Sequence, residues 1–394
     1  MQIKQRTVML VFGTRPEAIK LAPVVLEMQS GAHGLRPLVC ATGQHRQMLD
    51  QVLEWFRIKP DYDLGLMQPD QTPADLTSRA LQSLSKVLAE ARPDMVLVQG
   101  DTTTALAAAL AAFYHRIPVG HVEAGLRTGD LYNPYPEEMN RRAISVLTAY
   151  HFAPTQAAAN ALLAEQVDPA TVFNVGNTVV DALRITSARP VDLELGFPTN
   201  GRRLILVTAH RRESFGPAFE SMCCALRQLA ERNPDVELVY PVHLNPNVRD
   251  PVGRILSGCP RIHLIEPLRY EQFVHLMSGC YLILTDSGGI QEEATVLGKP
   301  TLIMRHTTER PEAISSGTAK LVGTDPERII GESERLLRDG EAYRSMSQGN
   351  CPFGDGHAAT HILDILARAS TFTVPAVTDG AVHGNRMAAR TASE

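Results

Sequence analysis

Hydrophobic and polar positions alternate along the chain in blocks that predict a strand, then a helix, repeated through both halves. Short apolar runs bounded by glycine or polar turns are typical of buried parallel strands, and the longer amphipathic segments between them predict helices. Such an alternation predicts an α/β fold with parallel sheets. The expected strands are Val8–Phe12, Leu38–Ala41, Met95–Gln99, Val119–Glu123, Tyr150–Ala153, Val172–Val175, Leu204–Thr208, Val236–Pro241, Ile262–Ile265, Leu282–Thr285 and Thr301–Met304.

The pattern divides the chain into two units of similar construction. Residues 1–188 are expected to form the first domain and residues 189–356 the second, joined by a stretch up to residue 201 that is rich in turn-forming residues. A helix at about 357–369 is expected to pack back on the first domain. Residues 370–394 lack periodicity and large apolar side chains, and we interpret them as a disordered tail.

Composition narrows the classes of function. The 394 residues are 44% hydrophobic and 21% charged, as in an ordinary globular protein with sizeable cores. The net charge of -5 and the scattered basic residues argue against nucleic acid or an anionic membrane as partner. The absence of a long apolar run and of a signal-peptide pattern predicts a cytoplasmic protein. Six cysteines without Cys-x-x-Cys spacing predict reduced thiols.

A glycine-rich turn near the end of the second domain predicts an anion site. Ser287, Gly288 and Gly289 follow a buried strand and open a helix, where free backbone amides and the helix dipole favour a diphosphate. Glu293 lies about one helical turn further on, where its carboxylate could accept hydrogen bonds from a ribose diol. In the alternative interpretation the glycines only make a tight turn, and Glu292 and Glu293 only complement the helix dipole.

A second turn of this kind follows the first strand. Arg15 lies at the turn and Lys20 about one helical turn beyond it, so both could approach an anion at the carboxyl end of the sheet. Alternatively, Lys20 is a solvated helix residue and Arg15 pairs with a nearby acid. Pro23 is expected to kink or shorten the helix that contains Lys20.

Three carboxylates come from three separated turns of the first domain. Asp101 is a candidate acid or base, although its position also suits a helix cap. Glu123 shares a face with His121 by the two-residue period, but no third ligand lies at metal spacing, so no metal site is predicted. Glu137 begins a helix with Arg141 four residues later, and the alternative is a simple pair between these two side chains.

The second domain contributes a histidine and an arginine. His210 follows a strand and lies between polar residues, although a lone histidine is more often structural. Arg310 could contact a phosphate or a sugar hydroxyl, or pair with Glu309 or Glu312.

Several motifs occur in order along the chain. They are Gly13-Thr14-Arg15-Pro16-Glu17, Gly100-Asp101-Thr102, His121-Val122-Glu123-Ala124-Gly125-Leu126-Arg127, Pro136-Glu137-Glu138 with Asn140-Arg141, His210-Arg211-Arg212-Glu213 and Asp286-Ser287-Gly288-Gly289. With them, the chain from residue 7 to about 369 resembles the non-hydrolysing UDP-N-acetylglucosamine 2-epimerases. The resemblance implies two Rossmann-like domains facing across a cleft, the GT-B architecture. It also implies a homodimer without metal or other cofactor that interconverts UDP-N-acetylglucosamine and UDP-N-acetylmannosamine for cell-surface polysaccharide.

The resemblance also implies roles for individual residues. UDP is eliminated to give 2-acetamidoglucal and then adds back after protonation from the opposite face, so two proton handlers are needed. We expect Asp101, Glu123 and Glu137 to share these transfers, and His210 to interact with the leaving phosphate or donate a proton. Gln99 stands where relatives often carry histidine. The residues expected to hold the nucleotide sugar are Arg15, Lys20, Arg141, Phe273, Ser287, Gly288, Gly289, Glu293 and Arg310.

A second ligand site and other functions stay open. Gln44, His45, Gln47 and Arg79 resemble a second, activating UDP-N-acetylglucosamine site, although polar loop residues also fit a plain domain edge. A GT-B glycosyltransferase would share the nucleotide-binding half but transfer the sugar to an acceptor. A hydrolysing epimerase would release free N-acetylmannosamine, and a nucleotide-sugar sensor would bind without turnover.

Overall fold

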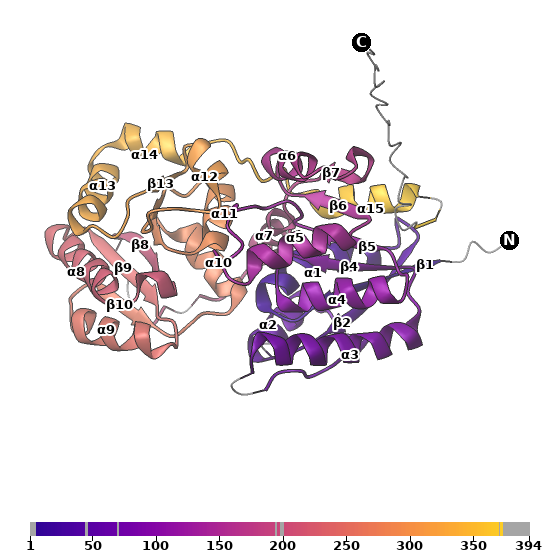
Figure 1. Ribbon diagram of the computed structural model, residues 1–394. Coiled ribbons are helices and arrows are strands. Elements are labelled where there is room, and N and C mark those ends of the chain that lie inside the picture. The colour runs from indigo at the N-terminus through magenta and orange to yellow at the C-terminus, as the bar shows by residue number, and fades with distance from the viewer. Residues whose placement is uncertain are drawn as a thin grey trace, which may run out of the picture.

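Two parallel sheets, each covered by helices, lie side by side in the computed structural model (Figure 1). The structure describes residues 5–43, 46–68, 71–193, 195–197, 201–369 and 371–372, without the side chains of residues 46 and 47. We call the part built on the first sheet the first lobe and the part built on the second sheet the second lobe.

The first lobe contains a seven-stranded sheet with the order β3-β2-β1-β4-β5-β6-β7, in which every neighbouring pair is parallel. Its strands are β1 (Arg6–Phe12), β2 (Leu35–Ala41), β3 (Tyr62–Asp63), β4 (Met95–Gln99), β5 (Val119–Val122), β6 (Tyr150–Ala153) and β7 (Val172–Asn174). Its helices are α1 (Arg15–Gln29), α2 (Arg46–Phe56), α3 (Pro73–Ala91), α4 (Thr103–Tyr114), α5 (Glu137–Leu147), α6 (Gln156–Ala164), the short 3-10 helix η1 (Pro169–Thr171) and α7 (Thr178–Ser187).

The second lobe repeats the architecture with a six-stranded parallel sheet of order β10-β9-β8-β11-β12-β13. Its strands are β8 (Arg203–Thr208), β9 (Val236–Pro241), β10 (Ile262–Ile265), β11 (Leu282–Thr285), β12 (Thr301–Ile303) and β13 (Ala319–Leu321). Its helices are η2 (Arg212–Ser214), α8 (Pro217–Arg232), α9 (Pro246–Leu256), α10 (Tyr270–Gly279), α11 (Gly288–Val296), α12 (Pro311–Ser315), α13 (Pro326–Arg338) and α14 (Gly340–Ser347).

Both sheets reverse their strand order at a central pair, β1 with β4 in the first lobe and β8 with β11 in the second. These strands are buried because helices cover both faces of each sheet, and their sequences are accordingly almost uninterrupted apolar runs. In open α/β sheets, ligands bind beyond the carboxyl ends of the strands at such a reversal. The loops after these four strands are therefore where a ligand site is expected.

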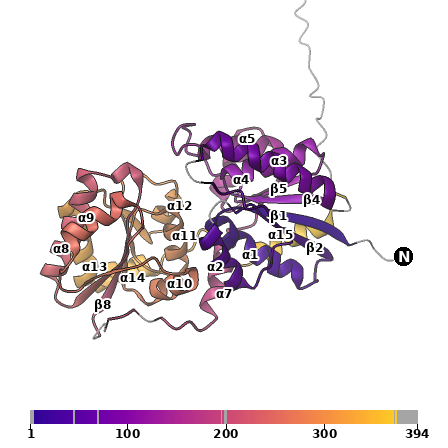
Figure 2. The same cartoon turned by 90° about the horizontal axis from the view of Figure 1, so that it is seen from below.

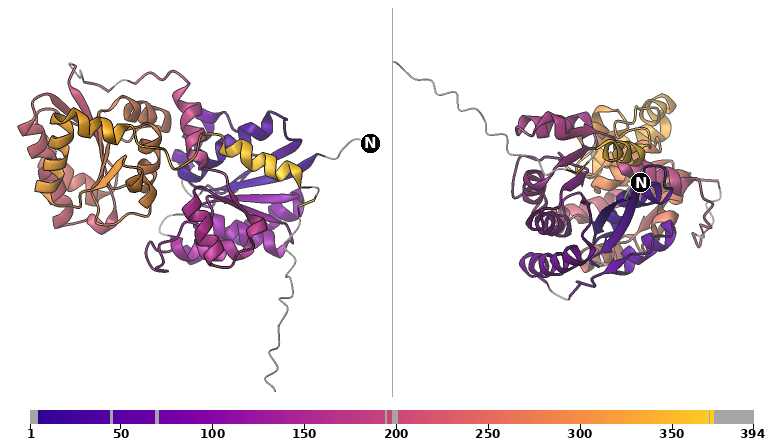
Figure 3. Two further views of the ribbon diagram at one scale, coloured as in Figure 1. Left: turned by 90° about the horizontal axis from the view of Figure 1, so that it is seen from above. Right: turned by 90° about the vertical axis from the view of Figure 1, so that its right-hand side faces the viewer.

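The last helix, α15 (Ala358–Arg368), returns to the first lobe, as Figure 3 shows in yellow beside that lobe. Ile362, Leu363 and Leu366 join the same hydrophobic cluster as apolar residues of α1. The carboxylate of Asp181 in α7 accepts hydrogen bonds from the backbone of Ala358 and Ala359, which holds the start of α15. The domain boundaries at residues 188 and 356 stay a prediction, and residues 373–394 lie outside the described part.

Several local predictions need correction. Strands β3 and β13 were not predicted, because two or three residues are too few to produce a recognisable pattern. Strand β2 begins at Leu35 rather than Leu38. Pro23 does not shorten its helix, since α1 runs on to Gln29.

Candidate functional site

The turns at the reversal in the first sheet are tied together by one buried carboxylate. Glu17 accepts hydrogen bonds from the backbone amides of Gly13 at 3.0 Å and Thr14 at 2.8 Å. Its other oxygen accepts from the hydroxyl of Thr102 at 2.6 Å, in the loop after β4. Burial raises the pKa of Glu17, and these hydrogen bonds oppose the shift. The turn after β1 and the loop that carries Asp101 are thus held in one arrangement.

Asp101 does not cap the helix that follows it. Thr102 is the capping residue of α4, and its hydroxyl accepts from the amide of Ala105 at 3.0 Å. The Asp101 carboxylate instead forms an ion pair with Arg141, with 2.8 Å between Nη2 and Oδ2. Asn140 donates its side-chain amide to the Asp101 carbonyl at 2.7 Å. Asp101 is therefore positioned by α5 and left free of a helix-capping role.

Glu137, the first residue of α5, lacks the expected pairing. Arg141 lies 3.1 Å from Glu138 and pairs with Asp101, so the predicted alternative of a Glu137–Arg141 pair is wrong. Among the described residues, Oε2 of Glu137 is buried without a hydrogen-bond partner. This oxygen is therefore not engaged by another protein group in the described structure, which suits a side chain that acts on a substrate.

Glu123 follows β5, and its backbone does not have the extended conformation of a strand. Its φ of 66° lies in the left-handed region, so it does not continue the alternation that was expected to place it beside His121. His121 Nε2 lies 2.7 Å from the Gly100 carbonyl, and burial lowers the pKa of His121 to about 3, which keeps it neutral. Glu123 instead accepts from the amide of Gln99 and lies 2.7 Å from the Lys20 ammonium.

Four buried charges connect the two lobes, and we call Lys20, Glu123, Glu292 and Arg310 the bridging cluster. Lys20 lies 3.0 Å from Glu292, and Arg310 lies 3.5 Å from Glu123, so both contacts cross between the lobes. Arg310 also pairs with Glu292 through Nε. The suggested pairing of Arg310 with Glu309 or Glu312 is therefore wrong. Figure 2 shows α11, which carries Glu292, beside the first lobe.

The bridging cluster shifts the proton affinities of its members. Burial raises the pKa of Glu123, the charge of Glu292 adds to that rise, and Lys20 and Arg310 oppose it. Burial would also raise the pKa of Glu292, but Arg310 and Lys20 outweigh it and hold that pKa well below its usual range. For Lys20, burial acts to lower the pKa, yet Glu123 and Glu292 outweigh it and the pKa is raised. Glu292 thus stays ionised while Glu123 holds a proton more readily.

The reversal in the second sheet places His210 beside the glycine turn. His210 follows β8 and Ser287 precedes α11 as its N-cap residue. A Cβ built on Gly288 would lie 3.6 Å from the guanidinium of Arg211, so that side chain lies over the start of α11. Arg211 was not among the predicted site residues, although it stands next to His210 in the motif that carried the resemblance.

Residues of both lobes also meet around Glu293. Burial, with a further contribution from Glu292, raises the pKa of Glu293 to about 7, while Lys20 and Arg15 oppose the shift. Burial lowers the pKa of Arg15, and the electrostatic effects of Glu293 and Tyr270 partly oppose this lowering. Arg15 of the first lobe therefore lies within electrostatic reach of Glu293. Phe273, one turn beyond Tyr270 in α10, is partly buried in the shared hydrophobic cluster.

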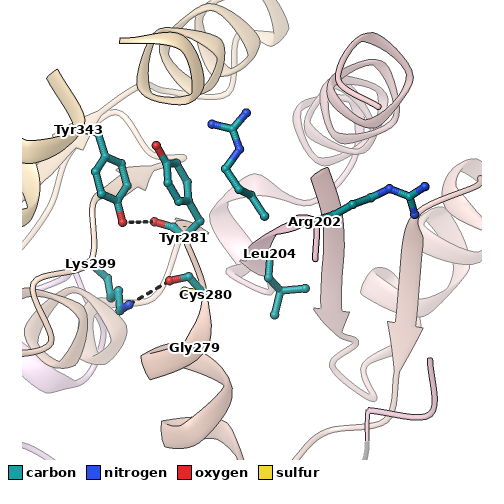
Figure 4. Close-up of a pocket in the computed structure, with 8 residues that line it drawn as sticks. Arg202, Leu204, Gly279, Cys280, Tyr281, Lys299 and Tyr343 are labelled. Atoms are coloured by element: carbon teal, nitrogen blue, oxygen red, sulfur yellow. Dashed lines mark hydrogen bonds between the residues drawn. The ribbon is translucent and has the colours of Figure 1, made fainter. Parts of the chain in front are cut away.

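The cavities in the second lobe lie away from these residues. One, of about 420 Å³, is at the amino ends of the strands, and Figure 4 shows Lys299 donating to the Cys280 carbonyl at 3.0 Å and Tyr343 to the Tyr281 carbonyl at 3.2 Å. Its position opposite the carboxyl edge argues against a substrate site. A second, of about 260 Å³, lies against α9 and includes Glu266. Neither is lined by a predicted site residue.

The predicted second ligand site is only partly within the described structure. Gln44 and His45, and the side chain of Gln47, lie outside the described residues. Arg79 donates to Gln68 at 2.6 Å and also pairs with Gln71. The activating site stays a prediction.

Other sequence-based expectations concern thiols, metals and membranes. All six cysteines are free, as predicted. Within the described ranges, no three side chains among His, Cys, Asp and Glu gather as a metal site requires. No helix in the described part of the chain combines the length and apolar character needed to cross a bilayer.

Comparison with known proteins identifies the family. A family model described as UDP-N-acetylglucosamine 2-epimerase matches residues 28–367. The UDP-N-acetylglucosamine 2-epimerase of Escherichia coli K12 is 54% identical over 368 residues, covering 91% of this chain and 98% of that protein. The chain belongs to the UDP-N-acetylglucosamine 2-epimerase family. The resemblance predicted from the motifs is confirmed.

Solved structures of this epimerase family have the same fold. The Neisseria meningitidis UDP-GlcNAc 2-epimerase, solved with UDP-GlcNAc, is 48% identical with a TM-score of 0.86, covering 92% of this chain and all of that one. The S. aureus MnaA–UDP co-structure is 44% identical with a TM-score of 0.86, covering 92% and 96%. The predicted α/β fold with two Rossmann-like domains in the GT-B arrangement is confirmed.

Proposed function

We propose that this chain interconverts UDP-N-acetylglucosamine and UDP-N-acetylmannosamine by inverting carbon 2 of the sugar. The family and the named activity of relatives about half identical over nearly the whole chain support this reaction. The observation in this chain that supports it best is the bridging cluster, because Glu123 contacts cations from both lobes where the two sheet edges meet. The product of the proposed reaction supplies N-acetylmannosamine units for polysaccharide.

The chemistry proceeds by elimination and re-addition. A carboxylate removes the proton on carbon 2, the bond from carbon 1 to the phosphate oxygen breaks, and its electron pair leaves with UDP. The electrons of the former C–H bond form the double bond of 2-acetamidoglucal. A second acid then returns a proton to carbon 2 from the opposite face while the UDP oxygen attacks carbon 1, so atoms and charge balance.

The first lobe supplies the proton-transfer groups in this proposal. Asp101 and Glu123 follow the paired strands β4 and β5, whose residues Gln99 and Val122 are partners in register, and Glu137 begins the next helix. Each differs in its surroundings, since Asp101 is paired with Arg141, Glu123 is buried among cations and Glu137 has an unpartnered oxygen. The three carboxylates therefore stand in three different settings, which suits groups with different roles in a two-face proton transfer.

The second lobe supplies the nucleotide-binding groups. The amides of Ser287, Gly288 and Gly289 at the start of α11 bind the diphosphate, and Glu293 accepts hydrogen bonds from the ribose hydroxyls. Arg15 joins them from the first lobe, while Arg310 and Lys20 balance the charge that develops as UDP leaves. His210 stabilises the departing phosphate or returns a proton to it.

Deuterium incorporation tests the reaction. The protein is incubated with UDP-N-acetylglucosamine in deuterated water, and both sugar nucleotides are followed by NMR. Deuterium at carbon 2 of both is expected, because the abstracted proton exchanges with solvent. Transfer of the sugar to an acceptor, release of free N-acetylmannosamine, or binding without exchange would instead identify a glycosyltransferase, a hydrolysing epimerase or a sensor.

The Asp101→Asn variant tests the role of one carboxylate. Exchange is expected to fall by two or more orders of magnitude, in the range that general acid–base catalysis contributes, while UDP still binds. Asp325→Asn is the matched control, because Asp325 truly caps a helix, accepting from the Arg328 amide at 2.9 Å, and asparagine caps equally well. Near-normal exchange by Asp101→Asn would remove Asp101 from the mechanism.

The chain is also proposed to form a homodimer through the first lobe. At the ends of the neighbouring helices α4 and α5, Tyr114 is 65% exposed and Val146 is 86% exposed, and the exposed Phe113 precedes Tyr114. A second copy would remove this apolar surface from water. Sedimentation of Val146→Glu is expected to show monomers where the parent chain and the control Leu163→Glu are dimers; unchanged dimers would exclude this surface.

A further inference from the structure

The carboxylate of Asp286 occupies the loop after β11, directly beside His210. It is fully buried, and Oδ2 accepts hydrogen bonds from the backbone amides of His210 at 2.7 Å and Arg211 at 2.8 Å. In the loop after β8, which carries His210, the carbonyl of Ala209 accepts a hydrogen bond from the Tyr240 hydroxyl at 2.6 Å. The backbone around His210 is therefore fixed at three successive residues.

The second oxygen of Asp286 is directed to the histidine ring. Oδ1 is buried without a hydrogen-bond partner among the described residues, and it lies 3.6 Å from Nδ1 of His210. A buried carboxylate oxygen normally has a donor, because leaving it without one forfeits its hydration. A sub-ångström approach of the ring would supply that donor.

Four charged or titratable groups lie around the partly exposed ring. His243 stacks on His210 with 5.3 Å between ring centroids and 13° between planes. The charged and titratable groups that face His210 are Asp286, His243, Arg211 and Arg15. Asp286 is the only one of these four that favours the protonated ring, while partial burial and the other three lower the pKa of His210.

We propose that Asp286 is a positioning residue that binds Nδ1–H of His210 and so directs Nε2 into the site as a proton donor. This assignment rests on the proposed function, in which His210 meets the leaving phosphate. Only the doubly protonated ring can donate from Nε2, and Asp286 favours that form against the burial and the three other groups that oppose it. Its Nε2 proton moves to the anionic oxygen released from carbon 1, which leaves the neutral ring with its remaining proton on Nδ1, bound to Asp286. When UDP adds back, that proton returns to Nε2 and the ring again balances Asp286.

The Asp286→Asn variant tests this pair. Asparagine retains an oxygen for the two backbone amides but removes the charge that favours imidazolium. We expect kcat to fall roughly ten- to a hundredfold, the range found for carboxylates that orient metal-binding histidines, with the Kd for UDP within about threefold. The alkaline limb of the pH profile of kcat should move to lower pH, because the ring loses its proton more easily.

Asp181→Asn is the matched control. Asp181 is also buried and accepts two backbone amides, from Ala358 at 3.2 Å and Ala359 at 2.9 Å, but it lies outside the proposed site. Its pH profile should match that of the parent chain. In a His210→Asn background, Asp286→Asn should cause no further loss of kcat; an independent, multiplicative loss would overturn the assignment.

Nitrogen NMR of the histidine rings gives a readout independent of activity. In the parent chain with UDP, the His210 signals should show a proton on Nδ1, and in Asp286→Asn they should change. A His210 ring without a proton on Nδ1 in the parent chain would overturn the proposal even if the variant does not fold. If the parent chain showed the protonated Nδ1 but no deuterium exchange, the epimerase function would fail while the Asp286–His210 pair would stand.

Discussion

Replacing Glu292 by glutamine removes one charge from the bridging cluster with almost no change of shape. Lys20 and Arg310 donate to different oxygens of Glu292, so glutamine keeps an acceptor for only one of them and turns an amide NH2 toward the other. The variant also loses the negative charge that raises the pKa of Glu123. With that charge gone, Glu123 becomes easier to ionise and a weaker base.

The size of the effect follows from the cluster geometry. Lys20 lies 2.7 Å from Glu123 and 3.0 Å from Glu292, which places the two carboxylate oxygens within about 6 Å of each other. At an effective dielectric constant of about 20, two unit charges at about 6 Å interact by roughly 3 kcal/mol. Allowing for relaxation, the titration that reports Glu123 should move down by about one to two pH units.

The assay is the pH profile of kcat, measured by NMR in both directions of the reaction. In the direction in which Glu123 is proposed to remove the proton, the acidic limb should move down by about one to two pH units in Glu292→Gln. If the logarithm of the rate falls by half of the decrease in the pKa of Glu123, the plateau value of kcat falls by roughly three- to tenfold. In the opposite direction, the alkaline limb should move down by the same amount.

Glu237→Gln is the control for loss of a buried charge elsewhere. Glu237 lies 2.6 Å from Arg202 and 2.7 Å from His263, and it is buried as Glu292 is. This variant should leave the pH profile unchanged. A folded Glu292→Gln protein whose limbs coincide with those of the parent chain would refute the electrostatic link between Glu292 and Glu123.

Two further predictions concern the nucleotide and the backbone. Because the pKa of Glu293 is raised to about 7 and only the ionised carboxylate accepts both ribose hydroxyls, the affinity for UDP should weaken as pH falls below 7, by up to about tenfold per unit. Titration calorimetry of Glu293→Gln should lack this dependence, and an identical dependence would contradict the assignment. Gly125→Ala should lower the melting temperature, since φ is 93° and the new Cβ would lie 2.2 Å from the Ala158 carbonyl oxygen. Gly129 has a φ of 84° but open space around it, so Gly129→Ala carries only the conformational penalty of about 1 kcal/mol. It should melt at a higher temperature than Gly125→Ala, and equal melting temperatures for the two variants would refute the steric argument.

The positions of the candidate residues along the strands were predictable, and their partners were not. Asp101 and His210 follow apolar runs, and parallel strands end at a common edge, so sequence alone places both near a ligand. The contact between Lys20 and Glu292 joins residues far apart in the chain, and no local pattern encodes it. Glu292 was therefore interpreted only as a partner of the helix dipole.

Local rules also failed where buried charges compete for partners. Helical spacing suggested a pair between Glu137 and Arg141, but Arg141 contacts Asp101 and Glu138. A buried guanidinium requires several acceptors, and a residue on a neighbouring loop can supply them better than one on the same helix. The two-residue period failed at Glu123 because the backbone turns left-handed immediately after β5.

The arrangement of the bridging cluster explains how two lobes joined by buried charges can still separate. The pair Lys20–Glu123 lies within the first lobe, and the pair Glu292–Arg310 lies within the second. Each lobe therefore keeps a neutral pair when the two contacts between the lobes break, and no isolated buried charge is left behind. Opening then forfeits only the attraction between two neutral pairs, which is weaker than that between bare ions. In the proposed reaction, in which the glucal is held until UDP returns and the product is then released, such an interface lets the lobes separate without leaving an unpaired charge on either one.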